Sequence, residues 1–462
     1  MSLAGILIIL GFFIFAALMV ARIIPPLLTL PLMAAWTCQV AHLPINDYLN
    51  VILLAGSMKL AGAMAVVIFG AMFARVIMKA GISDSLIKKA AELAGDQPRF
   101  IAILIFGAVV FVFLGMSGLG AVIMAGSIAL PIMTGAGIAP LDAAVILVLG
   151  ISTGLMANLA NYGTYIGIFG GQVVTECYPP ALLICGLFSL LYIFVNIRAG
   201  RNSHGSFVGI IKLLILGAVS VPGSFVKSLG GVFQVQETTL FSKKDNTPAA
   251  ALVTPAIPLI TVYAFRYICG FNVKEGGVDP VAAAICGFIL ASVYAVLLTK
   301  PRELINIMAG AIVEGIRDVA GVLFLFMGIG MLVAAVMHPA VAAVLNPLLL
   351  DVVPKSSVGL ALFFAILAPT ALYRGPLNMF GMGAGIAVLL YALHLIEPAV
   401  LCGMFIGVQF LQGISDPTNS SNTWIADFVR ADTGDILRKT LPYSWGMCLA
   451  MLLVVLIRQG GL

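Results

Sequence analysis

Gly115-Met-Ser-Gly-Leu-Gly120 interrupts one long apolar region, and Gly154-Leu-Met-Ala-Asn-Leu-Ala-Asn161 interrupts the next. The same order returns later in the chain, where Tyr373-Arg-Gly-Pro-Leu-Asn378 is followed by Gln412-Gly-Ile-Ser-Asp-Pro-Thr-Asn-Ser-Ser-Asn422. Irregular polar backbone is tolerated at bilayer depth only where protein or a water-filled cavity surrounds it. Two such pairs are typical of a membrane transporter built from two related halves.

A constant spacing relates the two halves. Pro140 and Pro398 are 258 residues apart, and so are Asn158 and Asp416. We therefore divide the chain into a first repeat at 1–200, a cytoplasmic or interfacial linker at 201–248 and a second repeat at 249–462. Each repeat is predicted to hold a helical hairpin, at about 100–135 and 358–393, and a broken helix, at about 141–171 and 400–426.

The composition is that of a polytopic membrane protein. Hydrophobic residues make up 61% of the chain and charged residues 9%, which leaves too little polar surface to cover a soluble core. The seven cysteines include no Cys-x-x-Cys pair, so neither a zinc site nor a disulfide framework is indicated. The net charge of +5 does not imply nucleic acid, because what matters is where Lys and Arg lie relative to the spans.

No pattern indicates an enzyme or a cofactor. The glycine-dense Gly381-Met-Gly-Ala-Gly385 follows no predicted strand, so it lacks the context of a dinucleotide site. The four histidines have no metal-ligand spacing, and no nucleophile–base constellation stands out. We expect no bound metal other than a sodium ion.

The apolar segments predict the helices. Those of the first half are 3–21, 24–40, 60–77, 100–114 with 119–134, 141–171 with a break, and 180–197. Those of the second half are 249–267, 280–298, 319–337, 358–372 with 377–393, 400–426 with a break, and 441–457. Amphipathic surface helices are predicted ahead of the hairpins at 83–95 and 302–317. Segment 207–221 is interpreted as interfacial; if it crosses, the repeats become parallel.

The hairpin arms and the basic residues predict the topology. Arms of about 15 residues are shorter than the ~20 residues of a full crossing, so both hairpins are expected to be re-entrant. If every other segment crosses once, most Lys and Arg share one side, and only Lys274, Lys355 and Arg458 lie clearly opposite. The positive-inside rule then makes the basic side cytoplasmic and the two repeats inverted.

Arg374 is a candidate for binding an anion. A guanidinium between two apolar arms costs roughly 2.5–3.5 kcal/mol on insertion scales unless it is paired. Helix N-termini at a hairpin tip offer free N–H groups, so a carboxylate substrate is a natural partner for this planar donor. Gly375 and Asn378 belong to the same tip. The alternatives are that Arg374 pairs permanently with an acid such as Asp416, or that it snorkels.

Asp416 is a candidate for holding the coupling ion. Pro417 removes a backbone donor and opens the helix, which exposes carbonyl and hydroxyl oxygens. Such oxygens suit a sodium ion, and a carboxyl group can also take up a proton. The predicted ion ligands are Asp416, Ser415, Ser420 and Ser421, and Thr418 and Asn419 are predicted substrate contacts. The alternative is that Asp416 caps the next helical segment.

The first half contributes uncharged groups to the predicted site. Ser117 and Gly118 lie at its hairpin tip, and Asn158, Asn161 and Thr164 lie at its helix break. Amide and hydroxyl groups suit a carboxylated or polyhydroxylated solute. The alternative is packing, because Gly, Asn and Ser also mediate close helix contacts in bilayers.

The Ser-Gly-Leu-Gly tip, the Pro-led broken helix and the Ser-Asp-Pro-Thr-Asn-Ser run resemble the ion transporter superfamily, and most closely its gluconate permease, citrate–cation symporter and C4-dicarboxylate carrier families. The resemblance covers nearly the whole chain by architecture. It implies an elevator-type secondary carrier in the cell inner membrane, often a homodimer, with a scaffold and a transport domain. Tyr373-Arg374-Gly375-Pro376 departs from these families, which place small polar residues there, so the usual substrate is in doubt.

These observations predict an all-α carrier that couples H+ or Na+ to the symport of a small organic anion across the cytoplasmic membrane. The expected partners are that anion, the coupling cation and the lipid bilayer. A cation–proton antiporter would use Asp416 without an organic substrate. A membrane subunit of a binding-protein-dependent carrier would show no uptake when reconstituted alone.

Overall fold

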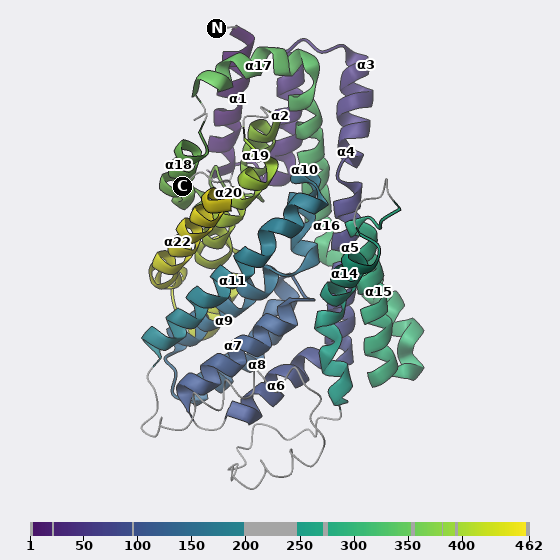
Figure 1. Cartoon of the computed structure of the whole chain (residues 1–462), viewed down its shortest axis with the longest axis vertical. Helices are drawn as coiled ribbons and strands as arrows, with labels where there is room; N and C mark the ends of the chain where they lie inside the picture. The colour runs from purple at the N-terminus through teal and green to yellow at the C-terminus, as the bar shows by residue number, and fades with distance from the viewer. Residues whose placement is uncertain are drawn as a thin grey trace.

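The computed structural model describes residues 3–20, 23–94, 97–197, 247–270, 276–352, 356–380, 382–392 and 396–458. Within these residues the chain forms helices joined by turns (Figure 1). Seven of the described helical segments are long and apolar enough to cross a bilayer. The predicted all-α polytopic membrane fold is confirmed. The predicted linker 201–248, including 207–221, lies almost entirely outside the described residues.

Two long helical segments pack against each other in antiparallel orientation. The first runs over Ile45–Ala80 and ends in α5 (Ala61–Ala80), and the second contains α16 (Leu304–Met337). A Cβ placed on Gly330 would lie 2.2 Å from the carbonyl oxygen of Gly56, so the two backbones touch at one end. Near the other end, Arg75 bonds Asp318. Residue numbers therefore rise along one helix as they fall along the other.

The two halves repeat the same order of elements. Each has two helices, a long helix, a peripheral helix, a hairpin, a broken helix and a closing helix. Because the equivalent long helices run antiparallel, the repeats are inverted. The members of the first half are α1 (Leu3–Val20), α2 (Pro26–Val40), α5, α6 (Ile82–Ala94), α7 (Pro98–Phe113) with α8 (Leu119–Gly135), α9 (Pro140–Leu155) with α10 (Gly163–Phe169), and α11 (Gly171–Asn196).

The second half follows the same plan. Its members are α14 (Ile257–Ile268), α15 (Pro280–Thr299), α16, α17 (Pro339–Val352), α18 (Ser357–Leu367) with α19 (Met382–Ala392), α20 (Pro398–Phe410) with α21 (Ser420–Val429), and α22 (Thr433–Arg458). In each half, two helices joined by a short tip precede a helix that begins at a proline and is then interrupted. Peripheral helices α6 and α17 lie at opposite ends of the molecule, as inversion requires (Figure 1).

The helices pack into two groups. In the scaffold group, α16 packs along α5 and α2, and α14 and α15 pack beside α5. In the core group, α9 packs against α7, and α20 packs against α11 and α22. The first group contains the long helices and the second contains the hairpins and broken helices. The polar interruptions singled out in the sequence lie in the core group or where it meets the scaffold, because the first helix break and α10 also pack on α5.

Two predicted boundaries and one predicted pairing of helices are wrong. Segment 302–317 is not a separate surface helix, because all but its first two residues lie in α16. The true equivalent of α6 is α17, whose sequence carries too few charges to look amphipathic. Helix α11 begins at Gly171 and contains Pro179 and Pro180, so the predicted start at residue 180 is nine residues late. Proline is tolerated inside membrane helices because neighbouring groups satisfy the freed carbonyls.

Candidate functional site

Asp416 ties the break in the second broken helix to the tip of the second hairpin. Its Oδ1 accepts hydrogen bonds from the backbone N–H of Tyr373 at 3.0 Å and from the N–H and hydroxyl of Thr418 at 2.9 and 2.8 Å. The carboxyl is buried, with 2% of the residue exposed. Helix α20 continues as a π-helical turn over Leu411–Ser415 and opens at Asp416, which leaves the carboxyl facing the hairpin.

The same tip has an unusual backbone conformation. Tyr373 has a φ of 56°, in the left-handed region that a non-glycine residue adopts at a cost of roughly 1–2 kcal/mol. At the next glycine, a Cβ on Gly375 would lie 2.0 Å from the carbonyl oxygen of Thr370, so a side chain does not fit. Asp416 thus stabilises this strained turn, because its carboxylate accepts a hydrogen bond from the backbone N–H of Tyr373.

Two buried amides hold the rest of the second tip. Asn378 donates to the carbonyl of Ala371 at 3.1 Å and accepts from the N–H of Phe380 at 3.0 Å. Gln412 accepts from the N–H of Met379 at 2.8 Å. Gln412 belongs to the interrupted stretch, but the sequence analysis did not assign it a role. Its position one turn before Asp416 is the signal that could have identified it.

Asn158 forms the corresponding tie in the first half. Its side-chain amide donates to the carbonyl oxygens of Phe113 at 3.0 Å and Met116 at 2.9 Å, both at the tip of the first hairpin, and 1% of the residue is exposed. Asn158 and Asp416 are equivalent by spacing, and each fixes a hairpin tip to the adjacent helix break. In the first half, the helix break donates hydrogen bonds through the side-chain amide of Asn158. In the second half, the helix break accepts them through the carboxylate of Asp416.

Replacing Asn158 by aspartate is expected to destabilise the protein strongly. The shape is kept, but two carbonyls lose their donor, at about 1–3 kcal/mol for each buried group left unpaired, and a charge is buried beside them. Thermal unfolding of the purified protein in detergent measures this. Asn161→Asp is the control, because Asn161 is only partly buried and makes a 3.2 Å bond to Leu155. Equal unfolding temperatures for both variants would contradict the role of Asn158.

The other predicted site residues fall into three sets. Thr164 is buried at the start of α10, and its hydroxyl makes no hydrogen bond to any residue that the structure describes. Asn419, rather than Asp416, caps α21 by accepting from the N–H of Ser421, so the capping alternative for Asp416 is wrong. The residues of the third set are exposed or partly exposed at the hairpin tips and helix breaks: Ser117, Gly118, Asn161, Thr418, Ser420 and Ser421.

The predicted ion ligands do not share one set of contacts. Ser415 bonds the hydroxyls of Thr440 at 2.8 Å and Ser444 at 2.7 Å, both on α22. The hydrogen bonds of the Asp416 carboxyl described above go instead to the hairpin and to Thr418. The neighbouring residues Ser415 and Asp416 therefore face different elements. Arg374 ends the 3-10 helix that follows α18, and its side chain lies outside the described part of the molecule.

The two helix breaks lie close together. A Cβ on Gly413 would lie 3.8 Å from the hydroxyl oxygen of Ser152, which places the turn before one break beside the end of α9. Helix α21 packs against α8 and α9, and Trp424 covers Gly126 of α8. Tyr165 of α10 reaches the carbonyl of Phe405 of α20 at 3.4 Å. The half-helices of each repeat thus pack on the other repeat.

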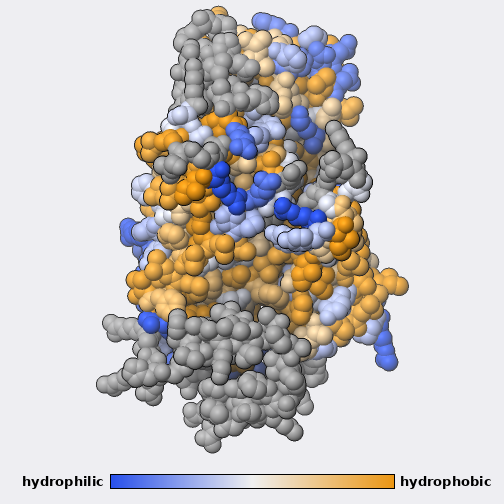
Figure 2. All heavy atoms as spheres, in the orientation of Figure 1, coloured by the Kyte–Doolittle hydropathy of each residue, from blue (hydrophilic) through white to orange (hydrophobic). Residues whose placement is uncertain are grey.

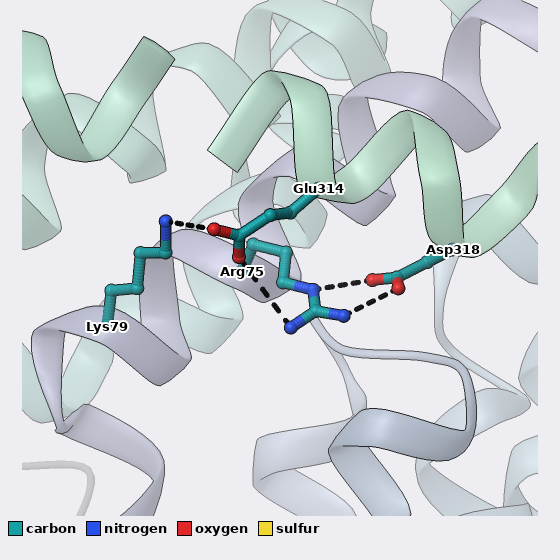
Figure 3. Close-up of polar contacts among 4 residues, drawn as sticks. All are labelled: Arg75, Lys79, Glu314 and Asp318. Atoms are coloured by element: carbon teal, nitrogen blue, oxygen red, sulfur yellow. Dashed lines mark hydrogen bonds and ion pairs between the residues drawn. The ribbon is translucent and has the colours of Figure 1, made fainter. Parts of the chain in front are cut away.

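Four charged residues lie between the long helices α5 and α16 (Figure 3). Arg75 bonds both carboxylate oxygens of Asp318 at 2.5 Å and lies 3.7 Å from Glu314, which pairs with Lys79 at 2.7 Å. The sequence analysis missed this cluster. Arg75 lies inside a predicted span, and Asp318 lies between a predicted surface helix and the next span. Charges inside apolar helices were the available signal.

A cavity of about 530 Å³ opens where the ends of α11, α14, α20 and α22 meet. Its charged lining residues are Glu176, Arg266, Glu397 and Arg458. On the face in view, Figure 2 shows hydrophilic residues gathered between hydrophobic zones. The predicted site residues do not line this cavity. In the described part of the chain, His, Cys, Asp and Glu form no group that could hold a metal ion.

The fold is shared with solved transporters. The crystal structure of the YdaH transporter of Alcanivorax borkumensis matches 93% of this chain and 98% of its own, with 16% identity and a TM-score of 0.62. The chain has a transporter fold. The MtrF structure of Neisseria gonorrhoeae, described as illuminating a class of antimetabolite efflux pumps, matches 92% of this chain and 84% of its own, with 15% identity and a TM-score of 0.50.

No protein-family model and no curated protein matches the chain. At identities of 15 and 16%, the structural likeness establishes the fold alone. Together with the seven apolar segments, it makes this chain a multi-pass membrane protein.

Proposed function

We propose that the protein is a secondary carrier of the ion transporter superfamily type, which couples H+ or Na+ to the movement of a small organic carboxylate. The main support is the tie between Asp416 and the backbone of Tyr373. This hydrogen bond connects an ionisable group at a helix break directly to the hairpin tip that carries Arg374. A change in the charge of Asp416 therefore changes the conformation of the proposed anion site.

The roles follow from this arrangement. Arg374, with Gly375 and Asn378, takes the carboxylate of the substrate, and Ser117, Gly118, Asn158, Asn161, Thr164, Thr418 and Asn419 complete the substrate site. Asp416 takes the cation, with Ser415, Ser420 and Ser421 near it. The scaffold group stays fixed in the inner membrane, as one half of a homodimer, while the core group moves. Alternating access then needs no rearrangement inside either group.

Uptake of labelled carboxylates into proteoliposomes tests the proposal. Arg374→Ala is expected to abolish uptake and to leave expression and the unfolding temperature near those of the unchanged protein, because the substrate loses its planar two-pronged donor. Arg374→Lys keeps the charge without the fork, so it should retain a small part of the activity. Transport by Arg374→Ala at the unchanged rate would remove the anion site from Arg374.

Export is the second candidate. The structural likeness to MtrF, a member of a class of efflux pumps by its description, favours the same machinery running outward. The two directions differ in the sign of the response to an imposed ion gradient. An inward cation gradient drives accumulation by a symporter and depletion by an exporter that exchanges its substrate for the cation.

A further inference from the structure

A basic residue of the scaffold reaches the first hairpin tip. A Cβ placed on Gly120 would lie 3.8 Å from Nη2 of Arg75, although the two residues belong to different helix groups. The first tip has no charged residue of its own, since Met116-Ser-Gly-Leu-Gly120 and the whole of α8 are uncharged. The second tip carries Arg374. The scaffold thus supplies a guanidinium beside the first tip, whereas the second tip has an arginine in its own sequence.

The carboxylate of Asp318 binds the guanidinium of Arg75 as a free carboxylate ligand would. Nε and Nη2 of Arg75 each bond one carboxylate oxygen at 2.5 Å, which is the side-on, two-pronged geometry that a free carboxylate adopts on arginine. About a third of the side chain of Asp318 and a quarter of that of Arg75 are exposed, at 37% and 27%. The pair is therefore accessible from outside the packed interior.

We propose that Arg75 is a second carboxylate-binding residue, and that Asp318 is an internal carboxylate which the substrate displaces from it. This inference rests on the proposed carrier function and names the group that receives the anion at the first hairpin. Arg75 belongs to the scaffold and Gly120 to the core group. The Arg75 guanidinium can therefore contact a solute at the first tip only while the first hairpin is in the position that it has in this structure.

The charge balance of the cluster favours an added carboxylate. Arg75 and Lys79 come from α5, Glu314 and Asp318 come from α16, and α8 contributes no charge, so the four groups sum to zero. Lys300 of α15 is nearby and donates to the backbone carbonyl of Lys79. A substrate carboxylate on Arg75 adds one negative charge. With Lys300 counted, the cluster carries one positive charge, which the substrate carboxylate offsets.

Two variants, assayed in oriented membrane vesicles, test whether the substrate displaces Asp318 from Arg75. Asp318→Asn removes the competitor and keeps Arg75, so KM for the carboxylate should fall about tenfold at the face where the first hairpin opens. Arg75→Gln combined with Asp318→Asn removes both charges without leaving either unpaired. In that double variant KM should rise at the same face.

The matched control is Asp142→Asn combined with Lys439→Met, which neutralises an ion pair between α9 and α22 in the core group. Its KM should stay unchanged at both faces. If the double variant at Arg75 and Asp318 shows an unchanged KM, the cluster only clamps two helices and the inference is wrong, whereas the carrier function stands. If the unchanged protein moves no carboxylate, both fail. Arg75→Lys, which keeps the ion pair, provides a folded variant whose KM should also rise.

Discussion

Asp416→Ala is expected to abolish transport and to lower the stability of the second hairpin. The change leaves the N–H of Tyr373 without its 3.0 Å acceptor, at about 1–3 kcal/mol for a buried donor. The same bond holds Tyr373 in its left-handed conformation, so the tip should relax and move Arg374. Hydrogen exchange at 368–380 measures the loosening, and carboxylate flux in proteoliposomes measures the function.

Asp416→Asn separates the two roles of this residue. An asparagine keeps an oxygen that can accept from Tyr373 and Thr418, so the tip should stay ordered, but it can neither ionise nor bind a cation strongly. We expect exchange at the tip close to that of the unchanged protein and transport that no longer responds to an ion gradient. Full coupling in Asp416→Asn would show that the coupling ion binds elsewhere.

Gly330→Ala is expected to cause the largest loss of stability in the scaffold group. The new Cβ would lie 2.2 Å from the carbonyl oxygen of Gly56, and a backbone atom cannot turn aside as a flexible side chain can. The long helices must separate, and overpacking of this kind costs about 1–3 kcal/mol. A fall in the unfolding temperature in detergent is the expected measurement.

The matched control lies in the same helix. A Cβ on Gly321 of α16 meets nothing within 4 Å, so Gly321→Ala should be neutral, or should stabilise the helix by up to about 1 kcal/mol because alanine is the better helix former. Equal losses in the two variants would mean that helix propensity, and not the close contact at Gly56, governs the result.

Much of the fold could be predicted because its signals are local. The Pro-led starts at Pro140 and Pro398, the Gly-containing tips and the polar breaks all mark their own positions, and their shared spacing showed the repeat. Helix α17 could not be found in this way. It has no charge periodicity, and its identity as the partner of α6 depends on the packing of the complete repeat.

The site was predicted as a set of residues but not as a set of contacts. The equivalence of Asn158 and Asp416 was visible in the sequence, whereas their opposite hydrogen-bonding roles depend on which backbone groups each tip presents. Arg75 and Asp318 are 243 residues apart. Only the antiparallel packing of the long helices brings them together beside the first hairpin, so no local pattern could have joined them.

The unlike chemistry of Asn158 and Asp416 gives the two hairpin tips unlike attachments. An amide that donates to two carbonyls has no titratable form, so that latch has a single setting. In the proposed carrier, the Asp416 carboxylate can exchange the N–H of Tyr373 for the coupling cation, so this attachment can respond to that ion. In that carrier, the two equivalent positions would thus combine a permanent attachment of the first tip with a responsive attachment of the second.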